Sequence, residues 1–323
     1  MYKKISEATH YKSVKERMEK IVIYLENNLN EIEHLLSLPA NQDRFDACLN
    51  FFYPIIDNIP LVVNYLSNIP IIRARPNYNE EVFSEDYQIS YNSRNKGKIK
   101  AGRFNDIEEP IFYGCLPVKN EGIDQGLSAS LESCKELISI IDAPKIQDMT
   151  LSEWVIKTPF PVINLCFNDE HLKGNPEIKK VFDDYILDLR ENFSPQVSRF
   201  IQRFLVFISD LSSSNKFENC YYVLTALFKV IDYYFHKVLK QPFHGIIYPS
   251  AMSESKGLNI ALLPKTVDDF LYPNHVIMFR YFKVKDELRY VSYPISDVAK
   301  VNNRCFELRN FLVDQTKHCR YFY

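Results

Sequence analysis

Apolar residues recur at intervals of three and four positions between residues 12 and 37, which is the period of an amphipathic helix. The apolar positions are Val14, Met18, Ile21, Leu25, Leu29, Ile32 and Leu36, and the opposite face carries Lys15, Glu16, Lys20, Glu26 and Glu33. Short helices are also predicted at residues 44–52, which Pro54 interrupts, and at 61–66. Residues 1–69 are therefore expected to form an N-terminal helical region, either packed on the rest of the protein or used for dimerisation or partner binding.

After residue 70 the pattern changes to short apolar runs bounded by glycine, proline and polar residues, which is typical of strands. Strands are predicted at 71–75, ended by Pro76, and at 111–116, 154–157, 162–166, 245–248, 258–263, 276–282 and 288–293. The polar residues 77–100 are expected to form a long loop, and loops of that length often cover a site. A helix is predicted at 127–141.

The helical period returns between residues 176 and 240. Asn175-Pro176 and Ser194-Pro195 each place a capping residue ahead of a proline at the first helical position. Residues 221–239 form another apolar helical stretch, and a last helix is predicted near 304–315. The chain is therefore expected to have an α+β fold, with residues 70–323 as one domain that carries a helical insertion at about 176–215.

Composition excludes several classes of protein. The 323 residues carry a net charge of −2, which gives no basic signal for direct contact with nucleic acid. The seven cysteines form no Cys-x-x-Cys pair, so neither a disulfide framework nor a zinc site is expected, and no other metal site is predicted. No apolar run reaches 18 residues, so no membrane span is expected, and no signal peptide is visible. We expect a cytoplasmic protein.

Candidate chemistry lies in four separated stretches. The central one is Ala101-Gly102-Arg103-Phe104-Asn105, followed by an apolar run that ends in Tyr113. Glycine permits close approach of the backbone to a ligand, and arginine offers a planar donor fork that suits phosphate. The other stretches are Ile71-Ile72-Arg73-Ala74-Arg75, Ala129-Ser130-Leu131-Glu132 and Gly245-Ile246-Ile247-Tyr248-Pro249-Ser250.

In order and local context these stretches resemble the RES domain, which is named for its Arg, Glu and Ser. The matching positions are Arg73, Gly102 to Asn105, Tyr113, Glu132, Tyr248 to Ser250, Gly257 and Asn259. The resemblance runs from about Pro70 to about Val276. It departs from the family in the long interval between Glu132 and Ser250, in the N-terminal 70 residues, and in the absence of an aromatic residue directly before Arg73. It implies an ADP-ribosyltransferase-like mixed sheet.

The resemblance further implies an enzyme that degrades NAD⁺, as a phosphorylase or glycohydrolase, and that serves as the toxin of a toxin–antitoxin or defence system. Cleavage of the nicotinamide–ribose bond develops oxocarbenium character on the ribose, which a nearby carboxylate stabilises. Glu132 is the candidate for this role, and Glu136 is the nearest other choice. Arg73 and Arg103 would hold the diphosphate, with Arg75 as a further candidate. Tyr113 would line the nicotinamide–ribose pocket, Ser250 would orient groups, and Gly102 and Asn105 are further candidates for contact with NAD⁺.

Two alternatives follow from the same residues. The protein would transfer ADP-ribose to a host protein, or it would be a non-catalytic binding or scaffold protein on a degenerate RES fold. The expected partners are NAD⁺ as substrate, a protein antitoxin and further copies of the chain. Cys115 lies near the proposed site without a visible activating partner, so we interpret it as a buried thiol. No Gly-x-Gly-x-x-Gly is present, so NAD⁺ is not expected on a Rossmann turn.

Overall fold

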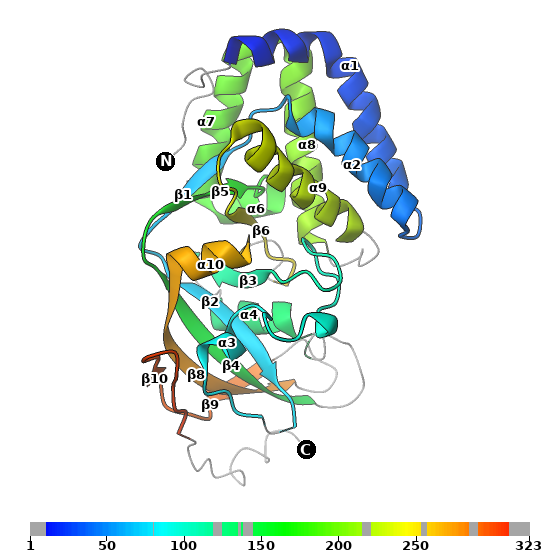
Figure 1. Cartoon of the computed structure of the whole chain (residues 1–323). Coiled ribbons are helices and arrows are strands. Elements are labelled where there is room, and N and C mark those ends of the chain that lie inside the picture. The colour runs from blue at the N-terminus through cyan, green and yellow to red at the C-terminus, as the bar shows by residue number, and fades with distance from the viewer. Residues whose placement is uncertain are drawn as a thin grey trace.

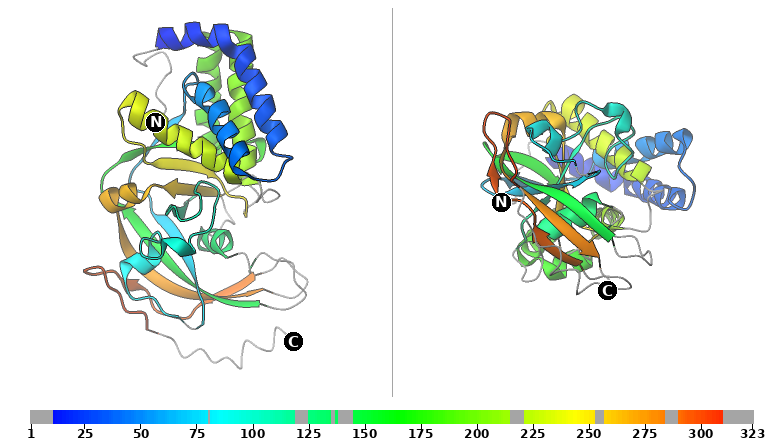
Figure 2. Two further views of the ribbon diagram at one scale, coloured as in Figure 1. Left: turned by 45° about the vertical axis from the view of Figure 1, so that its right-hand side comes forward. Right: turned by 90° about the horizontal axis from the view of Figure 1, so that it is seen from below.

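A bundle of helices lies at one end of the molecule and a large twisted sheet at the other (Figure 1). Figure 2 shows the same separation from a second direction. The computed structural model describes residues 11–79, 81–118, 125–134, 137, 145–214, 221–252, 257–283 and 290–309. Within these ranges the fold is mixed α and β, with one large mixed sheet.

The helical end is built from the N-terminal helices, the helices of the expected insertion, and the helix that follows the insertion. It comprises α1 (Tyr11–Leu35), α2 (Gln42–Ile56), α7 (Pro176–Asn192), α8 (Pro195–Ser213) and α9 (Tyr221–Tyr233). The periodic residues Met18, Leu25 and Leu29 of α1 are fully buried, as their spacing predicts. They share one hydrophobic core with residues of α2, α7, α8 and α9. The N-terminal helices therefore pack directly against the inserted ones.

Two predictions for the N-terminal region are wrong. Helix α2 does not end ahead of Pro54 but runs on to Ile56. Phe52 and Ile55, on either side of the proline, are fully buried in the helical core, and this packing outweighs the cost of a proline in the last turn.

Residues 61–66 are not helical. Val63–Leu66 form strand β1, which pairs antiparallel with β5 (Phe160–Asn164). A six-residue segment between two prolines is too short for a stable helix, and the ladder to β5 satisfies its backbone groups instead.

The described residues form a sheet of ten strands in the order β1-β5-β6-β7-β3-β2-β4-β8-β10, with β9 paired to β8. The pairings are antiparallel, apart from the parallel pair β5 and β6. The remaining strands are β2 (Ile71–Asn77), β3 (Phe112–Leu116), β4 (Lys145–Ile156), β6 (Gly245–Pro249), β7 (Leu258–Leu262), β8 (Leu271–Lys283), β9 (Tyr290–Pro294) and β10 (Ala299–Lys300). The predicted strands are thus present, several with longer bounds.

The two central strands β2 and β3 separate soon after they meet. They pair only at Ile72 and Cys115, whereas β4 pairs with β2 along residues 71–77. Strand β2 therefore continues through Pro76, where the sequence predicted its end. Past Ile72, the side of β2 that faces away from β4 has no strand partner among the described residues, and this fork opens the sheet for a cavity.

Several shorter elements complete the fold. The predicted loop 77–100 contains helix α3 (Asp86–Ile89), which buries Ile89, and a 3₁₀ turn at Lys96–Lys98. Helix α4 (Gln125–Ser133) covers the first part of the predicted helix 127–141, and residues 135, 136 and 138–141 lie outside the described ranges. Sequence reasoning missed α6 (Asp169–Gly174) and α10 (Pro264–Phe270), and the apolar stretch 221–239 ends in a π-helical turn at Tyr234–Leu239.

The predicted last helix is not found at residues 304–309, which are irregular, and its remainder lies outside the described ranges. No helix in the described part of the chain has the length and apolar character needed to cross a membrane.

Candidate functional site

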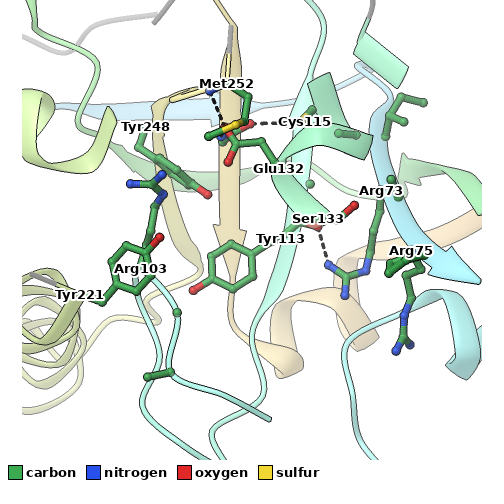
Figure 3. Close-up of a pocket in the computed structure, with 18 residues that line it drawn as sticks. Arg73, Arg75, Arg103, Tyr113, Cys115, Glu132, Ser133, Tyr221, Tyr248 and Met252 are labelled. Atoms are coloured by element: carbon green, nitrogen blue, oxygen red, sulfur yellow. Dashed lines mark hydrogen bonds between the residues drawn. The ribbon is translucent and has the colours of Figure 1, made fainter. Parts of the chain in front are cut away.

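A cavity of about 550 Å³ opens where β2 and β3 separate (Figure 3). Helix α4 and residues 101–103 close its sides, and Tyr221 at the start of α9 borders it. Six of the residues predicted for the site line this cavity: Arg73, Arg75, Gly102, Arg103, Tyr113 and Glu132. The fold thus brings together residues from β2, β3, α4 and the loop ahead of β3.

Glu132 projects from α4, and one of its carboxylate oxygens is held by three donors. Oε1 accepts hydrogen bonds from Ser250 Oγ at 2.7 Å, from Asn259 Nδ2 at 2.8 Å and from the backbone N–H of Met252 at 3.3 Å. The other oxygen has no hydrogen-bond partner among the described residues. The carboxylate is therefore fixed in orientation and presents one oxygen to the cavity.

Asn259 is itself oriented by a buried thiol. Cys115 Sγ donates to Asn259 Oδ1 at 3.0 Å, so the amide of Asn259 must turn its N–H₂ toward Glu132. Burial raises the pKa of Cys115 well above its usual value, and the charge of Glu132 raises it further. The thiol thus remains protonated and acts as a donor, which agrees with its interpretation as a buried thiol rather than a nucleophile.

Arg73 lies on the wall of the cavity opposite Arg103 and Tyr221 (Figure 3). Its NH1 donates to the carbonyl of Tyr113 at 2.5 Å, and its guanidinium carbon lies 4.9 Å from the centre of the Phe112 ring. Nε is buried and has no hydrogen-bond partner in the described structure. Burial, and then the charge of Arg75, lower the pKa of Arg73 to about 9, so the side chain keeps its charge at neutral pH. A cation on the wall of a cavity is suited to an anionic ligand.

The other two arginines are anchored differently. Arg75 NH1 donates to the carbonyl of Gln88 in α3 at 2.6 Å, and burial lowers the pKa of Arg75. Arg103 is buried, donates from NH1 to the carbonyl of Ser214 at 2.9 Å, and stacks over Tyr221 with 5.4 Å from its guanidinium carbon to the ring centre. The end of α8 and the start of α9 therefore position Arg103.

The loop ahead of β3 is held by Tyr113. The Tyr113 hydroxyl donates to Asn105 Oδ1 at 2.8 Å and accepts from the N–H of Phe104 at 3.0 Å. A Cβ atom on Gly102 would lie 2.4 Å from Asn105 Oδ1, so only glycine fits at this close approach. Asn105 is buried and does not line the cavity. Its N–H₂ group donates to the carbonyls of Lys100 and Asp106. Its contacts are those of a residue that shapes the loop.

Ser250 also lies behind the cavity wall. It is fully buried, its N–H donates to the carbonyl of Gly257 at 2.9 Å, and its hydroxyl is committed to Glu132. Ser250 therefore supports the carboxylate of Glu132 and does not reach the cavity.

Sequence reasoning did not single out two tyrosines as site residues. Tyr248 and Tyr221 both line the cavity, and Met252 borders it above Glu132 (Figure 3). Tyr248 belongs to the stretch that resembles the RES domain, and this was the signal that could have found it. Tyr221 had no such signal because its place depends on how α9 packs against the other helices. No cluster of three or more His, Cys, Asp or Glu side chains with metal-binding geometry occurs among the described residues.

Comparison of the chain with models of protein families gave no match, and the search of curated proteins gave none either.

Proposed function

We propose that the chain is an NAD⁺-degrading enzyme of the RES type, with an ADP-ribosyltransferase-like sheet, that breaks the bond between nicotinamide and ribose. One observation carries this proposal. The Glu132 carboxylate, fixed by three donors, shares a cavity of about 550 Å³ with the guanidinium groups of Arg73 and Arg103. That volume lies in the range of roughly 300–1,000 Å³ that is common for small-molecule sites.

The chemistry follows from the charges. When the glycosidic bond breaks, its electron pair leaves with the nitrogen of nicotinamide, which becomes neutral and needs no proton. Positive charge then develops on the ribose, as in glycoside hydrolysis. A carboxylate that is already oriented stabilises this charge without reorganisation, which is the most effective form of electrostatic catalysis. Glu132 supplies that carboxylate.

The second substrate completes the reaction. Attack by water on the ribose carbon gives ADP-ribose and releases one proton, and attack by phosphate gives the 1″-phosphate of ADP-ribose. The positive charge of Arg73 on the cavity wall favours binding of the diphosphate on its side of Glu132. Transfer to a protein side chain would use the same carboxylate and differ only in the acceptor.

An enzyme that removes NAD⁺ arrests growth, so we propose that the protein is the toxin of a pair and that a protein antitoxin covers this cavity. Expression of the wild-type chain should stop growth of the host cell, and Glu132→Ala should relieve the arrest at equal protein level. Harmless expression of the soluble wild-type protein would contradict the toxin part of the proposal.

The enzymatic part is tested by identifying the product. Purified protein is incubated with NAD⁺ labelled in the adenine, in buffer alone, with phosphate, and with cell lysate. Label in ADP-ribose indicates hydrolysis, label in the 1″-phosphate indicates phosphorolysis, and label on a protein band indicates transfer. If no arm gives a product and NAD⁺ does not raise the melting temperature, the scaffold alternative replaces the enzyme.

A further inference from the structure

Tyr248 on β6 is placed at the back of the cavity. Its side chain is only 3% exposed, and its ring packs edge-on against Phe104 with 4.9 Å between ring centres. It nevertheless lines the cavity, and Figure 3 shows its hydroxyl directed into the space beside Glu132 and Tyr113. The ring is thus held rigidly while the hydroxyl faces the cavity.

The hydroxyl of Tyr248 has no hydrogen-bond partner within the described part of the chain. Two other tyrosines have protein partners: the Tyr113 hydroxyl has two, and the hydroxyl of the buried Tyr185 donates to the carbonyl of Pro60 at 2.6 Å. A hydroxyl at the wall of a cavity that has no protein partner is left to hydrogen-bond with water or with a ligand. A hydroxyl that no protein group binds and that is directed into a cavity is free to bind an atom of a ligand.

We propose that Tyr248 contacts the substrate: its hydroxyl donates to one oxygen of a ribose, while Glu132 accepts a hydrogen bond from the adjacent ribose hydroxyl. This inference rests on the proposed function and names a recognition group for it. The second carboxylate oxygen of Glu132 has no partner among the described residues, so it is available for this bond. A donor next to an acceptor matches the vicinal diol of a ribose.

The protonation of Tyr248 supports this role. Burial raises its pKa well above the usual value, and the negative charge of Glu132 raises it further. The phenol is therefore neutral at neutral pH, and it acts as a donor and not as a base. Because its oxygen already lies beside the carboxylate, substrate binding requires no movement of the Phe104-packed ring.

NAD⁺ contains two riboses, so the ligand arms must separate them. ADP-ribose carries both the adenosine ribose and the ribose that would lie at Glu132, and it has no scissile bond to nicotinamide. AMP carries the adenosine ribose alone. The proposed function assigns the diol beside Glu132 to the ribose that bore nicotinamide. The contact with Tyr248 should therefore contribute to the affinity for ADP-ribose and not to the affinity for AMP.

The test is Tyr248→Phe, which keeps the ring and removes only the hydroxyl. We expect its affinity for ADP-ribose, measured by calorimetry, to fall about three- to tenfold, which is the worth of one hydrogen bond. Affinity for AMP should not change. The melting temperature of the unliganded variant should equal or exceed that of the wild type, because no protein partner is lost. Tyr185→Phe is the control: it should melt earlier, since it strands the carbonyl of Pro60, and should bind ADP-ribose as the wild type does.

A second measurement keeps the inference testable if the variant folds poorly. Wild-type protein should bind an ADP-ribose analogue that lacks the 2-hydroxyl or the 3-hydroxyl of the terminal ribose at least about threefold more weakly. The inference is overturned, while the proposed function stands, if Tyr248→Phe binds ADP-ribose as tightly as the wild type does and the wild type binds both analogues as tightly as ADP-ribose. An equal loss for AMP would overturn the assignment to the terminal ribose. If the wild type binds neither ADP-ribose nor AMP and releases no nicotinamide from NAD⁺, the proposed function fails together with this inference.

Discussion

The hydroxyl of Ser250 donates a 2.7 Å hydrogen bond to Oε1 of Glu132, although 118 positions separate the two residues in the chain. The serine follows strand β6 and the glutamate belongs to α4, so the bond joins two elements that the helical insertion separates in sequence. Both side chains were predicted as site residues from short stretches of sequence. Their contact distinguishes their roles, because Ser250 holds the carboxylate and Glu132 faces the cavity.

Ser250→Ala removes one of the three donors to Glu132. Hydrogen bonds to charged groups contribute about 1.5–3 kcal/mol, so we expect kcat for nicotinamide release to fall roughly 10- to 150-fold. The KM for NAD⁺ should change little, since the serine does not line the cavity. Ser198→Ala removes a comparable buried hydroxyl, which donates to the carbonyl of Leu189, and should leave kcat unchanged. A large rise in KM with normal kcat would contradict the supporting role.

Cys115 is expected to act as a hydrogen-bond donor and not as a nucleophile. Cys115→Ser keeps a donor toward Asn259 and should retain most of the activity. Cys115→Val removes the donor, frees the amide of Asn259 to turn over, and should lower kcat about tenfold. At neutral pH the native thiol should resist alkylation, because burial raises its pKa well above the usual value. Rapid alkylation in the folded protein would rule out this role.

Gly102→Ala tests the loop that carries Arg103. The new Cβ would lie 2.4 Å from Asn105 Oδ1 and 3.1 Å from the Tyr113 hydroxyl, so the loop must shift. Overpacking of this kind costs about 1–3 kcal/mol, which chemical denaturation will detect as a loss of unfolding free energy. Gly97→Ala is the matched control, because nothing lies within 4 Å of its added Cβ. Equal stabilities of the two variants would show that the close approach is unimportant.

Arg73 should set the pH dependence of ligand binding. Its pKa is lowered to about 9, so its positive charge is present at neutral pH and is lost as the pH rises through that value. Affinity for ADP-ribose should therefore be flat around neutral pH and decline above a pH of about 9. Arg73→Ala should bind ADP-ribose at least about tenfold more weakly at neutral pH and lose the alkaline decline. Persistence of that decline in the variant would assign it to another group.

Much of the sheet could be predicted from sequence, because short apolar runs bounded by glycine and proline mark strands wherever they pair. The prediction of a helix at residues 61–66 was wrong because the local sequence does not decide between a helix and a strand. Six apolar-rich residues between prolines fit either a helix or a strand, and only the distant partner β5 decides. The predicted end of the helix ahead of Pro54 was wrong for a similar reason. The helix continues because Phe52 and Ile55 are buried in the packed core, which the local sequence does not reveal.

In the candidate site, too, some residues could be placed from local sequence and others depend on how distant elements pack. Arg73, Gly102, Arg103, Tyr113 and Glu132 were predicted from local patterns, and they line one cavity. Asn105 and Ser250 carry equally plain patterns, yet they lie behind the wall, since sequence does not distinguish a side chain that faces a cavity from one that supports its neighbour. Tyr221 borders the cavity because the packing of α9 in the helical core places it there, and no nearby residue in the sequence indicates that place.

The role of Glu132 is best tested by comparing the release of nicotinamide from NAD⁺ by the wild type, Glu132→Gln and Glu153→Gln under single-turnover conditions, with and without phosphate. Glu132→Gln keeps the size of the side chain and removes the negative charge, and Glu153 on β4 pairs with His275 and does not line the cavity. We predict release by the wild type and by Glu153→Gln, and a rate at least about 100-fold lower for Glu132→Gln. Equal rates for all three proteins, or no release by the wild type at stoichiometric enzyme, would overturn the assignment of Glu132.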